Sequence, residues 1–243
     1  MKKNAMCDFH SHVLPGVDDG SRSVDESLKM LEMLKDQGVS VVVATPHFDA
    51  DRISIEHFLK RRRRAYDRVM EAAPDDIPQI RLGAEVLYYP GISRLEGLGD
   101  LCIEGTRLLL LEMPLSKWDK YAKDELINMA ALCGVVPVVA HVERCLPFQD
   151  RNFFDEFRTA DVLFQVNASF LINRSTRMRA LRLLKKGLIQ FIGSDCHGAV
   201  SRPPELGEAY RIVAKKLGED FLLGLFNFED LDIKQSEMRF SEK

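Results

Sequence analysis

Histidine and carboxylate side chains repeatedly follow short apolar runs along this chain. Five of its six histidines stand at such positions, with Asp and Glu at equivalent places, whereas His57 lies in a predicted helix and is assigned no role. Imidazole and carboxylate groups are donors for Mn²⁺, Fe²⁺ or Zn²⁺, and such a site needs no cysteine. Core packing does not explain the pattern, because a buried carboxylate is costly unless it is paired or bound to metal. The candidate ligands are His10, His12, Asp19, His47, Glu85, Glu112, His141, Asp195 and His197.

This donor set predicts a centre with more than one metal ion. Nine ligands exceed what a single ion takes, and they suffice for two or three ions when carboxylates bridge. His10 and His12 alternate along an extended segment, so both rings can reach one ion, whereas Cys196 should face the other side. Asp18 and Asp19 compete for one ligand position, since a DDG sequence is also typical of a turn. A multinuclear centre can clamp a phosphate and lower the pKa of a bound water.

Seven apolar runs are expected to position these side chains. Most of them are continuous rather than alternating, which is typical of parallel strands that are covered on both faces. The candidate ligands stand mainly where these runs end, and in a parallel α/β barrel the carboxyl strand ends open on the face that carries active sites. The predicted strands are Cys7–Phe9, Ser40–Ala44, Ile80–Val86, Leu108–Glu112, Val135–Ala140, Val162–Val166 and Ile189–Ile192.

Helical segments separate the predicted strands. Ser23 and Glu26 resemble a capping box that opens a helix ending at Gly38, and glycines 134 and 187 end two later helices. Alternating strands and helices predict βαβ units and a parallel sheet. Seven strands favour a closed or nearly closed α/β barrel, with a doubly wound open sheet as the alternative. The further predicted helices cover 54–73, 119–133, 151–160, 175–186 and 204–217.

The composition is that of one globular domain. The 243 residues, 46% apolar and 29% charged, fit a single domain over 1–243 with a sizeable core. A net charge of −3 argues against a general nucleic-acid binder. The N-terminal segment does not have the pattern of a signal peptide, and no stretch approaches the roughly 18–20 apolar residues that span a bilayer. The five scattered cysteines are expected to be reduced thiols, so the cytoplasm is the expected location.

Six ordered motifs give the chain a family resemblance. HSH, TPH, GAE, LLLLE, AHVER and SDCH, in this order, resemble the PHP superfamily of metal-dependent phosphoesterases. The longer segments DFHSHVLPGVDDGSRSVDESLKML, GAEVLYY, PVVAHVERC and QVNASF, and SDCH followed by SRPP, are similar to the bacterial manganese-dependent protein-tyrosine phosphatases associated with capsule and exopolysaccharide operons. The matching segments extend from about residue 7 to about residue 217.

The resemblance implies a fold, a cofactor and a substrate. The fold would be a distorted seven-stranded (β/α) TIM-like barrel of the PHP type, and the cofactor three divalent metal ions, with Mn²⁺ expected and Fe or Zn as alternatives. The substrate would be the phosphotyrosine tail of a bacterial tyrosine kinase that regulates capsular or exopolysaccharide synthesis, hydrolysed by metal-activated hydroxide. The implied ligands are His10, His12, Glu85 and Asp195 for one ion, Glu85, Glu112 and His141 for a second, and Asp19, His47 and His197 for the third.

Two arginines are candidates for binding the substrate phosphate. Arg144 and Arg202 lie on predicted loops at the same face, shortly after His141 and His197. Guanidinium groups match phosphate oxygens and suit the charge that develops in phosphoryl transfer. The resemblance assigns both positions to the phosphate, and surface salt bridging is the alternative. Asp19 or a bound water would supply a proton to the leaving oxygen.

Four alternative interpretations follow from other features. Cys145 and Arg151 have the C-x5-R spacing of cysteine-dependent tyrosine phosphatases, but Leu, Pro and Phe in the intervening loop disfavour a phosphate cradle. A small-molecule phosphatase of the histidinol-phosphatase type would share the motifs. A non-catalytic kinase-binding partner would be expected to lose ligands, and this chain keeps all nine. The basic run Arg61–Arg64 would attract an acidic tail or, as the favoured reading, form a solvated helix face.

Overall fold

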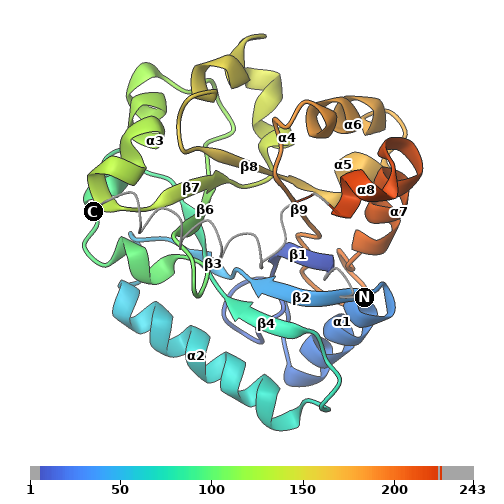
Figure 1. Ribbon diagram of the computed structural model, residues 1–243. Helices are drawn as coiled ribbons and strands as arrows, with labels where there is room; N and C mark the ends of the chain where they lie inside the picture. Colours follow the sequence, from blue (N-terminus) through green and yellow to red (C-terminus); the bar gives the residue numbers. More distant parts are fainter. Residues whose placement is uncertain (1–5, 224, 226–243) are drawn as a thin grey trace, which may run out of the picture.

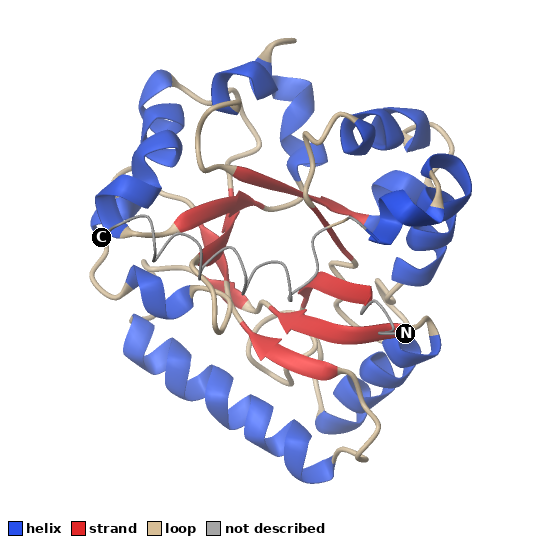
Figure 2. Cartoon of the chain, viewed as in Figure 1, coloured by secondary structure: helices blue, strands red, loops and turns tan. Residues whose placement is uncertain are grey.

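The computed structural model describes residues 6–223 and 225 of the chain. They form a mixed α/β fold in which a curled parallel sheet is surrounded by helices (Figures 1 and 2). The strands are β1 (Met6–Ser11), β2 (Val39–Ala44), β3 (His47–Phe48), β4 (Gln79–Leu82), β5 (Glu85–Leu87), β6 (Leu108–Glu112), β7 (Val136–Val139), β8 (Leu163–Asn167) and β9 (Phe191–Gly193).

The helices lie on the outer side of the curled sheet (Figure 1). The α-helices are α1 (Val24–Asp36), α2 (Ile55–Ala72), α3 (Lys120–Cys133), α4 (Val142–Cys145), α5 (Ala168–Ile172), α6 (Arg177–Lys185), α7 (Leu206–Leu217) and α8 (Glu219–Leu223). The 3-10 segments are η1 (Ile92–Arg94), η2 (Leu98–Leu101), η3 (Leu146–Phe148) and η4 (Phe153–Phe157). Within the described ranges, no helix is both long and apolar enough to span a membrane.

Hydrogen-bonded pairs follow the orders β1-β2-β4 and β3-β5-β6-β7-β8-β9, and every pair is parallel. The two parts meet where Ser11 at the end of β1 bridges Cys196 beyond β9. The backbone bonds His12 N–H to Cys196 O (3.0 Å) and Asp195 N–H to His10 O (2.8 Å) hold this junction. The prediction of a curled parallel α/β sheet is therefore confirmed, whereas the closed seven-stranded barrel stays a prediction.

Each predicted apolar run overlaps a strand, but one of them is divided. The run predicted as Ile80–Val86 becomes β4 and β5, which pair with different neighbours on either side of Gly83. A side chain at Gly83 would lie 3.2 Å from Ile103, so a glycine allows the close approach at this bend. Strand β3, two residues long, was not predicted because Pro46 separates it from β2.

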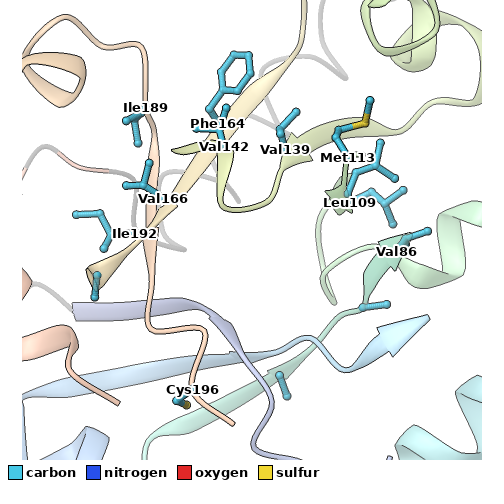
Figure 3. Close-up of a cluster of buried hydrophobic side chains, with 14 of the residues drawn as sticks. Val86, Leu109, Met113, Val139, Val142, Phe164, Val166, Ile189, Ile192 and Cys196 are labelled. Atoms are coloured by element: carbon cyan, nitrogen blue, oxygen red, sulfur yellow. The ribbon is translucent and has the colours of Figure 1, made fainter. Parts of the chain in front are cut away.

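Both faces of the sheet are buried, which explains the continuous apolar runs. In β6, Leu109 and Leu111 belong to the cluster between sheet and helices, whereas Leu108 and Leu110 belong to a second cluster inside the curl. Figure 3 shows side chains of the outer cluster from several strands, including Val86, Val139, Phe164 and Ile192. Inside the curl, Phe9 of β1 stacks on Phe191 of β9 at 3.8 Å between ring centroids.

Most predicted helices are present, and one is wrong. Ser23 caps α1 by accepting the Glu26 N–H at 3.2 Å, although the Glu26 carboxylate accepts the Arg22 N–H rather than that of Ser23. The segment 151–160 forms only the short 3-10 segment η4. Its phenylalanines 153, 154 and 157 pack against Phe164, so aromatic contacts rather than a regular helical hydrogen-bond pattern hold this segment.

Candidate metal centre

The nine predicted ligands gather in one cluster, which most of them reach from the carboxyl ends of strands. His10 lies in β1 and His12 directly after it, while Glu112 ends β6. His141 follows β7, and Asp195 and His197 follow β9. His47 and Glu85, which were expected at strand ends, begin the short strands β3 and β5 and pair with each other. Asp19 reaches the same place from the loop between β1 and α1.

Glu85 stands at the middle of the cluster and is 1% exposed. Its Oε2 lies 3.1 Å from His10 Nε2, 3.3 Å from His12 Nε2 and 3.1 Å from His47 Nδ1. Its Oε1 lies 2.8 Å from His141 Nε2. Burial alone would raise the pKa of the Glu85 carboxyl, but the surrounding histidines, His10 foremost, hold that pKa well below its usual value. The two oxygens thus face different imidazoles, as a bridging carboxylate requires.

Asp195 joins the histidines to both candidate phosphate-binding arginines. Its Oδ1 lies 3.6 Å from His10 Nε2 and 3.5 Å from His12 Nε2. Its Oδ2 accepts a hydrogen bond from Arg144 Nη2 at 2.6 Å and forms an ion pair with Arg202 Nη2 at 2.8 Å. Arg202 Nη2 also donates to the Asp195 backbone carbonyl at 3.2 Å. Burial would raise the pKa of the Asp195 carboxyl, but His10 and His12 keep it far below its usual value.

Asp18 and Asp19, which were expected to compete for one position, occupy different ones. Asp19 is 70% exposed, and its Oδ1 lies 3.5 Å from both His47 Nε2 and His197 Nε2. Asp18 is buried and accepts hydrogen bonds from His12 Nδ1 at 2.6 Å and from the His47 backbone N–H at 2.9 Å. Asp19 is therefore a candidate ligand, whereas Asp18 orients His12 from behind.

The donor atoms form three overlapping groups that could hold metal ions. Within each group the atoms lie within 4.8 Å of one another. His10 Nε2 and His12 Nε2 are 3.1 Å apart beside the same carboxylates, and His197 Nε2 is buried without a hydrogen-bond partner among the described residues. This crowding of nitrogens and carboxylate oxygens fits divalent cations. The groups are His10, His12 and Asp195; His47, Glu85 and Glu112; and His12, Asp19, His47 and His197.

Each of the three groups differs from the ligand set that the resemblance implies. Glu85 is not grouped with His10, His12 and Asp195, and His12 is added to the group of Asp19, His47 and His197. His47 rather than His141 joins Glu85 and Glu112. His141 nevertheless lies close to both carboxylates, since its Nε2 is 2.8 Å from Glu85 and 3.5 Å from Glu112. His47 presents different ring nitrogens to Glu85 and Asp19, which explains why it occurs in two groups.

Two amide side chains that sequence reasoning missed support the ligands. Gln165 Oε1 accepts the His141 backbone N–H at 2.7 Å and lies 3.2 Å from His10 Nδ1. Gln165 Nε2 donates to Asn167 Oδ1 at 3.0 Å, and Asn167 Nδ2 donates to Asp195 Oδ2 at 2.7 Å. The available signal was two polar residues at alternate positions of an otherwise apolar strand, within the QVNASF segment.

Backbone geometry around the centre is unusual. In the described chain, the non-glycine residues with positive φ are His141 (29°), Asp195 (53°) and Arg202 (56°). Such conformations cost of order 1–3 kcal/mol each and persist where the surrounding structure holds them. Gly193 permits a further close approach, because a Cβ there would lie 2.4 Å from the Cβ of His10. The strained positions thus coincide with candidate ligands and arginines.

Cys145 does not have the environment of a nucleophilic thiol. It is fully buried in α4, and its Sγ lies 3.9 Å from the carbonyl oxygen of Met113. Burial raises the pKa of the Cys145 thiol to about 12. A thiolate is the reactive form of cysteine, so this environment opposes the cysteine-phosphatase interpretation.

Fold and site together define an α/β protein whose curled parallel sheet carries a candidate polynuclear metal centre at its carboxyl edge. Residues 6–230 match the family model described as "Capsular polysaccharide synthesis, CpsB/CapC". The chain therefore belongs to the CpsB/CapC family of capsular polysaccharide synthesis, and the predicted relationship is confirmed.

Similar proteins agree with this assignment along nearly the whole chain. The tyrosine-protein phosphatase CpsB of Streptococcus pneumoniae is 30% identical over 233 residues, covering 88% of this chain and 91% of that protein. CpsB of Streptococcus agalactiae is 29% identical over 237 residues, covering 91% and 95%. A solved structure from work on YwqE of Bacillus subtilis and CpsB of Streptococcus pneumoniae, described as metal-dependent tyrosine phosphatases, has a TM-score of 0.77 at 24% identity, covering 93% and 94%. This structural likeness shows a shared fold.

Proposed function

We propose that this protein is a metal-dependent protein-tyrosine phosphatase. Its substrate is phosphotyrosine on a bacterial tyrosine kinase that regulates capsular or exopolysaccharide synthesis. The observation that carries the proposal is the meeting of Arg144 and Arg202 at one oxygen of Asp195, whose other oxygen faces the histidine cluster. A phosphate binding at this place would contact guanidinium groups and the metal centre together.

The ligand set divides into three metal sites in our proposal. Glu85 would contribute to the first two, which is supported by its two oxygens facing different imidazoles. Mn²⁺ is the ion we expect, and the same donors accept Fe or Zn. When bound, such ions polarise the phosphate and lower the pKa of a water for attack. The proposed sites are His10, His12, Glu85 and Asp195; Glu85, Glu112 and His141; and Asp19, His47 and His197.

The side chains of this chain bind the phosphate and assist departure of the tyrosine oxygen. Arg144 and Arg202 are 40% and 45% exposed, so their guanidinium groups can meet a phosphate that arrives from solvent. They neutralise charge on the phosphate oxygens as the bond to the tyrosine oxygen breaks. The phenol pKa of about 10 makes that oxygen a good leaving group, so its departure depends little on the proton that Asp19 or a bound water would supply.

We further infer that the sheet is a distorted seven-stranded barrel and that residues 1–243 form one domain. Support comes from β2 continuing into β3 and β4 into β5, and from the bridge between Ser11 and Cys196. A cytoplasmic location agrees with all five cysteines being free thiols.

Phosphate release from a phosphotyrosine peptide tests the function. Metal-stripped protein should be inactive, and Mn²⁺ should restore turnover of the peptide in preference to histidinol phosphate. Arg144→Gln should retain bound metal but lower kcat by about 10²–10³, as expected when one stabilising donor is removed. Preferred turnover of histidinol phosphate would replace the protein substrate by a small molecule. No turnover by folded, Mn²⁺-loaded protein would indicate a binding role instead.

A further inference from the structure

A basic groove lies beside the candidate metal centre. It has a volume of about 670 Å³ and runs between residues 15–17 of the β1–α1 loop and helix α2. The same loop carries Asp18 and Asp19, so one wall of the groove is close in the chain to a candidate metal ligand. Arg61 ties helix to loop by donating from Nη2 to the carbonyl of Gly16 at 2.8 Å.

The helix supplies a stripe of exposed basic side chains to this groove. His57, Lys60, Arg61, Arg64 and Arg68 line it, and their spacing of three or four residues places them on one face of α2. Arg61–Arg64 was expected to form a solvated helix face. This expectation is wrong for Arg62, whose side chain points away from the groove and into the protein. Arg62 is 9% exposed and donates to the carbonyl of Gly83 at 2.7 Å.

Part of the positive charge of this groove is not paired with any other described residue. Lys60 does have a partner, since it pairs with Glu56 at 2.5 Å. Arg64 and Arg68 are exposed and make no hydrogen bond or ion pair with any residue that the structure describes. The residues that line the groove include no carboxylate. An acidic ligand is the complementary partner, because each guanidinium can bind a carboxylate in bidentate geometry.

The dimensions of the groove suit a peptide that continues from the active site. Gly16 and Asp19 are three residues apart, so at most about 11 Å of chain separates the groove wall from a candidate ligand. From Arg61, which contacts Gly16, to Arg68 the stripe rises by about 10 Å along the helix, which about three residues of extended peptide would cover. A residue three to six positions from the phosphotyrosine would therefore lie over the stripe.

We propose that this groove binds acidic residues that flank the phosphotyrosine in the substrate. This inference rests on the proposed phosphatase function and adds sequence selectivity to it. Arg64 and Arg68 are the central contacts, whereas Arg61 mainly holds the loop. Substrates with Glu or Asp three to six residues from the phosphotyrosine bind more tightly than neutral ones.

Fluorescence anisotropy with a pair of labelled peptides tests the groove. Both peptides carry a non-hydrolysable phosphonate analogue of phosphotyrosine; one has three Glu residues at positions three to six from it, and the other has Gln there. The Glu residues are placed on the N-terminal side in one set and on the C-terminal side in another. Wild-type protein should bind a Glu peptide about fivefold more tightly than its Gln partner at low salt, given two partly exposed charge pairs.

Two double variants distinguish docking from a general charge effect. R64Q/R68Q should reduce the Glu-to-Gln preference to about one, since both charge pairs are removed. R179Q/R182Q removes the same charge from exposed positions of α6 that line a different groove, and it should keep the preference. The proposal would be overturned if wild-type protein bound the Glu and Gln peptides equally in both peptide sets. It would also be overturned if both double variants lost the Glu-to-Gln preference equally.

Hydrolysis of a small aryl phosphate separates this proposal from the proposed function. Mn²⁺-loaded R64Q/R68Q should turn over that substrate at the wild-type rate, because it does not reach the groove. Parallel loss of aryl phosphate turnover and peptide binding would mean that the arginines support the metal centre, and docking would be rejected. If wild-type protein hydrolyses neither substrate, the phosphatase proposal fails, and the anisotropy ratio still decides whether the groove binds acidic peptide.

Discussion

Asp18→Asn should weaken metal binding although Asp18 is not a proposed ligand. Asp18 Oδ2 accepts from both His12 Nδ1 (2.6 Å) and the His47 N–H (2.9 Å), and its Oδ1 accepts from the Gly20 N–H (2.9 Å). An Asn at this position must turn its NH₂ group toward at least one of these donors. If the NH₂ group faces His12, the imidazole must carry its proton on Nε2, the nitrogen that faces Glu85 and Asp195.

The expected loss follows from the cost of removing such an orienting contact. Hydrogen-bond partners of ligating histidines typically contribute about 10–100-fold to metal affinity, so we expect the Mn²⁺ dissociation constant to rise by about that factor. This corresponds to about 1.4–2.8 kcal/mol. The geometry supports an effect of this size, because Asp18 is buried and holds two candidate ligands, His12 and His47, through one oxygen.

Calorimetric titration of Mn²⁺ into metal-stripped protein measures this change, and excess Mn²⁺ should restore most of the phosphatase activity. Asp25→Asn, in the first turn of α1, is the control for a lost carboxylate and should bind metal like the wild type. Thermal unfolding of both metal-stripped variants reports any general loss of stability. An unchanged Mn²⁺ affinity in a folded Asp18→Asn protein would refute the role given to Asp18.

Three further predictions concern the thiol, the pH dependence of metal binding and a buried carboxylate. Cys145→Ser should retain aryl phosphate turnover, since its thiol is buried with a pKa near 12; abolished turnover in a folded variant would revive the thiol mechanism. Burial opposes protonation of His12, but its bonds to Asp18 and Glu85 raise its pKa to about 10, so metal-free protein carries a proton there at neutral pH. Mn²⁺ binding should therefore release protons, and its affinity should rise with pH. Calorimetric titrations in buffers of different ionisation enthalpy would detect the released protons. A pH-independent affinity between pH 6 and 9 would contradict this. Glu125→Gln should lower stability by about 1–3 kcal/mol, because the 5%-exposed carboxylate accepts bonds from Tyr88, Gly91 and Ser93. Burial would raise the pKa of Glu125, but these bonds lower it. In thermal unfolding, the stability of the wild type relative to Glu125→Gln should therefore be fully present at pH values above the usual pKa of Glu and should shrink as the pH falls through the lowered pKa. A stability difference that grows in acid would refute this.

Strand ends were predictable because parallel topology places them on one face whatever the details of packing. Six predicted strand ends and the loop that carries Asp19 therefore yielded nine side chains that the structure brings together, although His47 and Glu85 begin short strands instead of ending longer ones. The choice between Asp18 and Asp19 was not predictable, since it depends on which carboxylate the β1–α1 loop turns inward. Gln165 was missed for a similar reason, because its partners His10 and His141 are 155 and 24 residues away in the chain.

Other differences had a signal in the sequence. Arg62 stands at helical spacing from Phe58, Ala65 and Val69, all of which are buried. That spacing predicts Arg62 on the apolar face of α2, where its aliphatic stem packs and its guanidinium reaches a backbone carbonyl. The absent helix over 151–160 is different, since its charged and aromatic residues are compatible with a helix. Packing of the phenylalanines on Phe164 outweighs that propensity.

In the proposed function, Asp195 would connect metal binding to phosphate binding through one carboxylate. Its Oδ1 faces His10 and His12, while its Oδ2 accepts from Arg144 and Asn167 and forms an ion pair with Arg202. A positive φ at Asp195 is needed for this placement, and it is held by the bond from its own N–H to His10 O and by the Ser194 bonds to Asp8. Because the arginines are anchored on a residue that also faces the candidate metal ligands, a cation held there and a phosphate bound to the arginines would lie side by side. The geometry that makes the carboxylate a candidate ligand is therefore also the geometry that would aim both arginines at a bound phosphate.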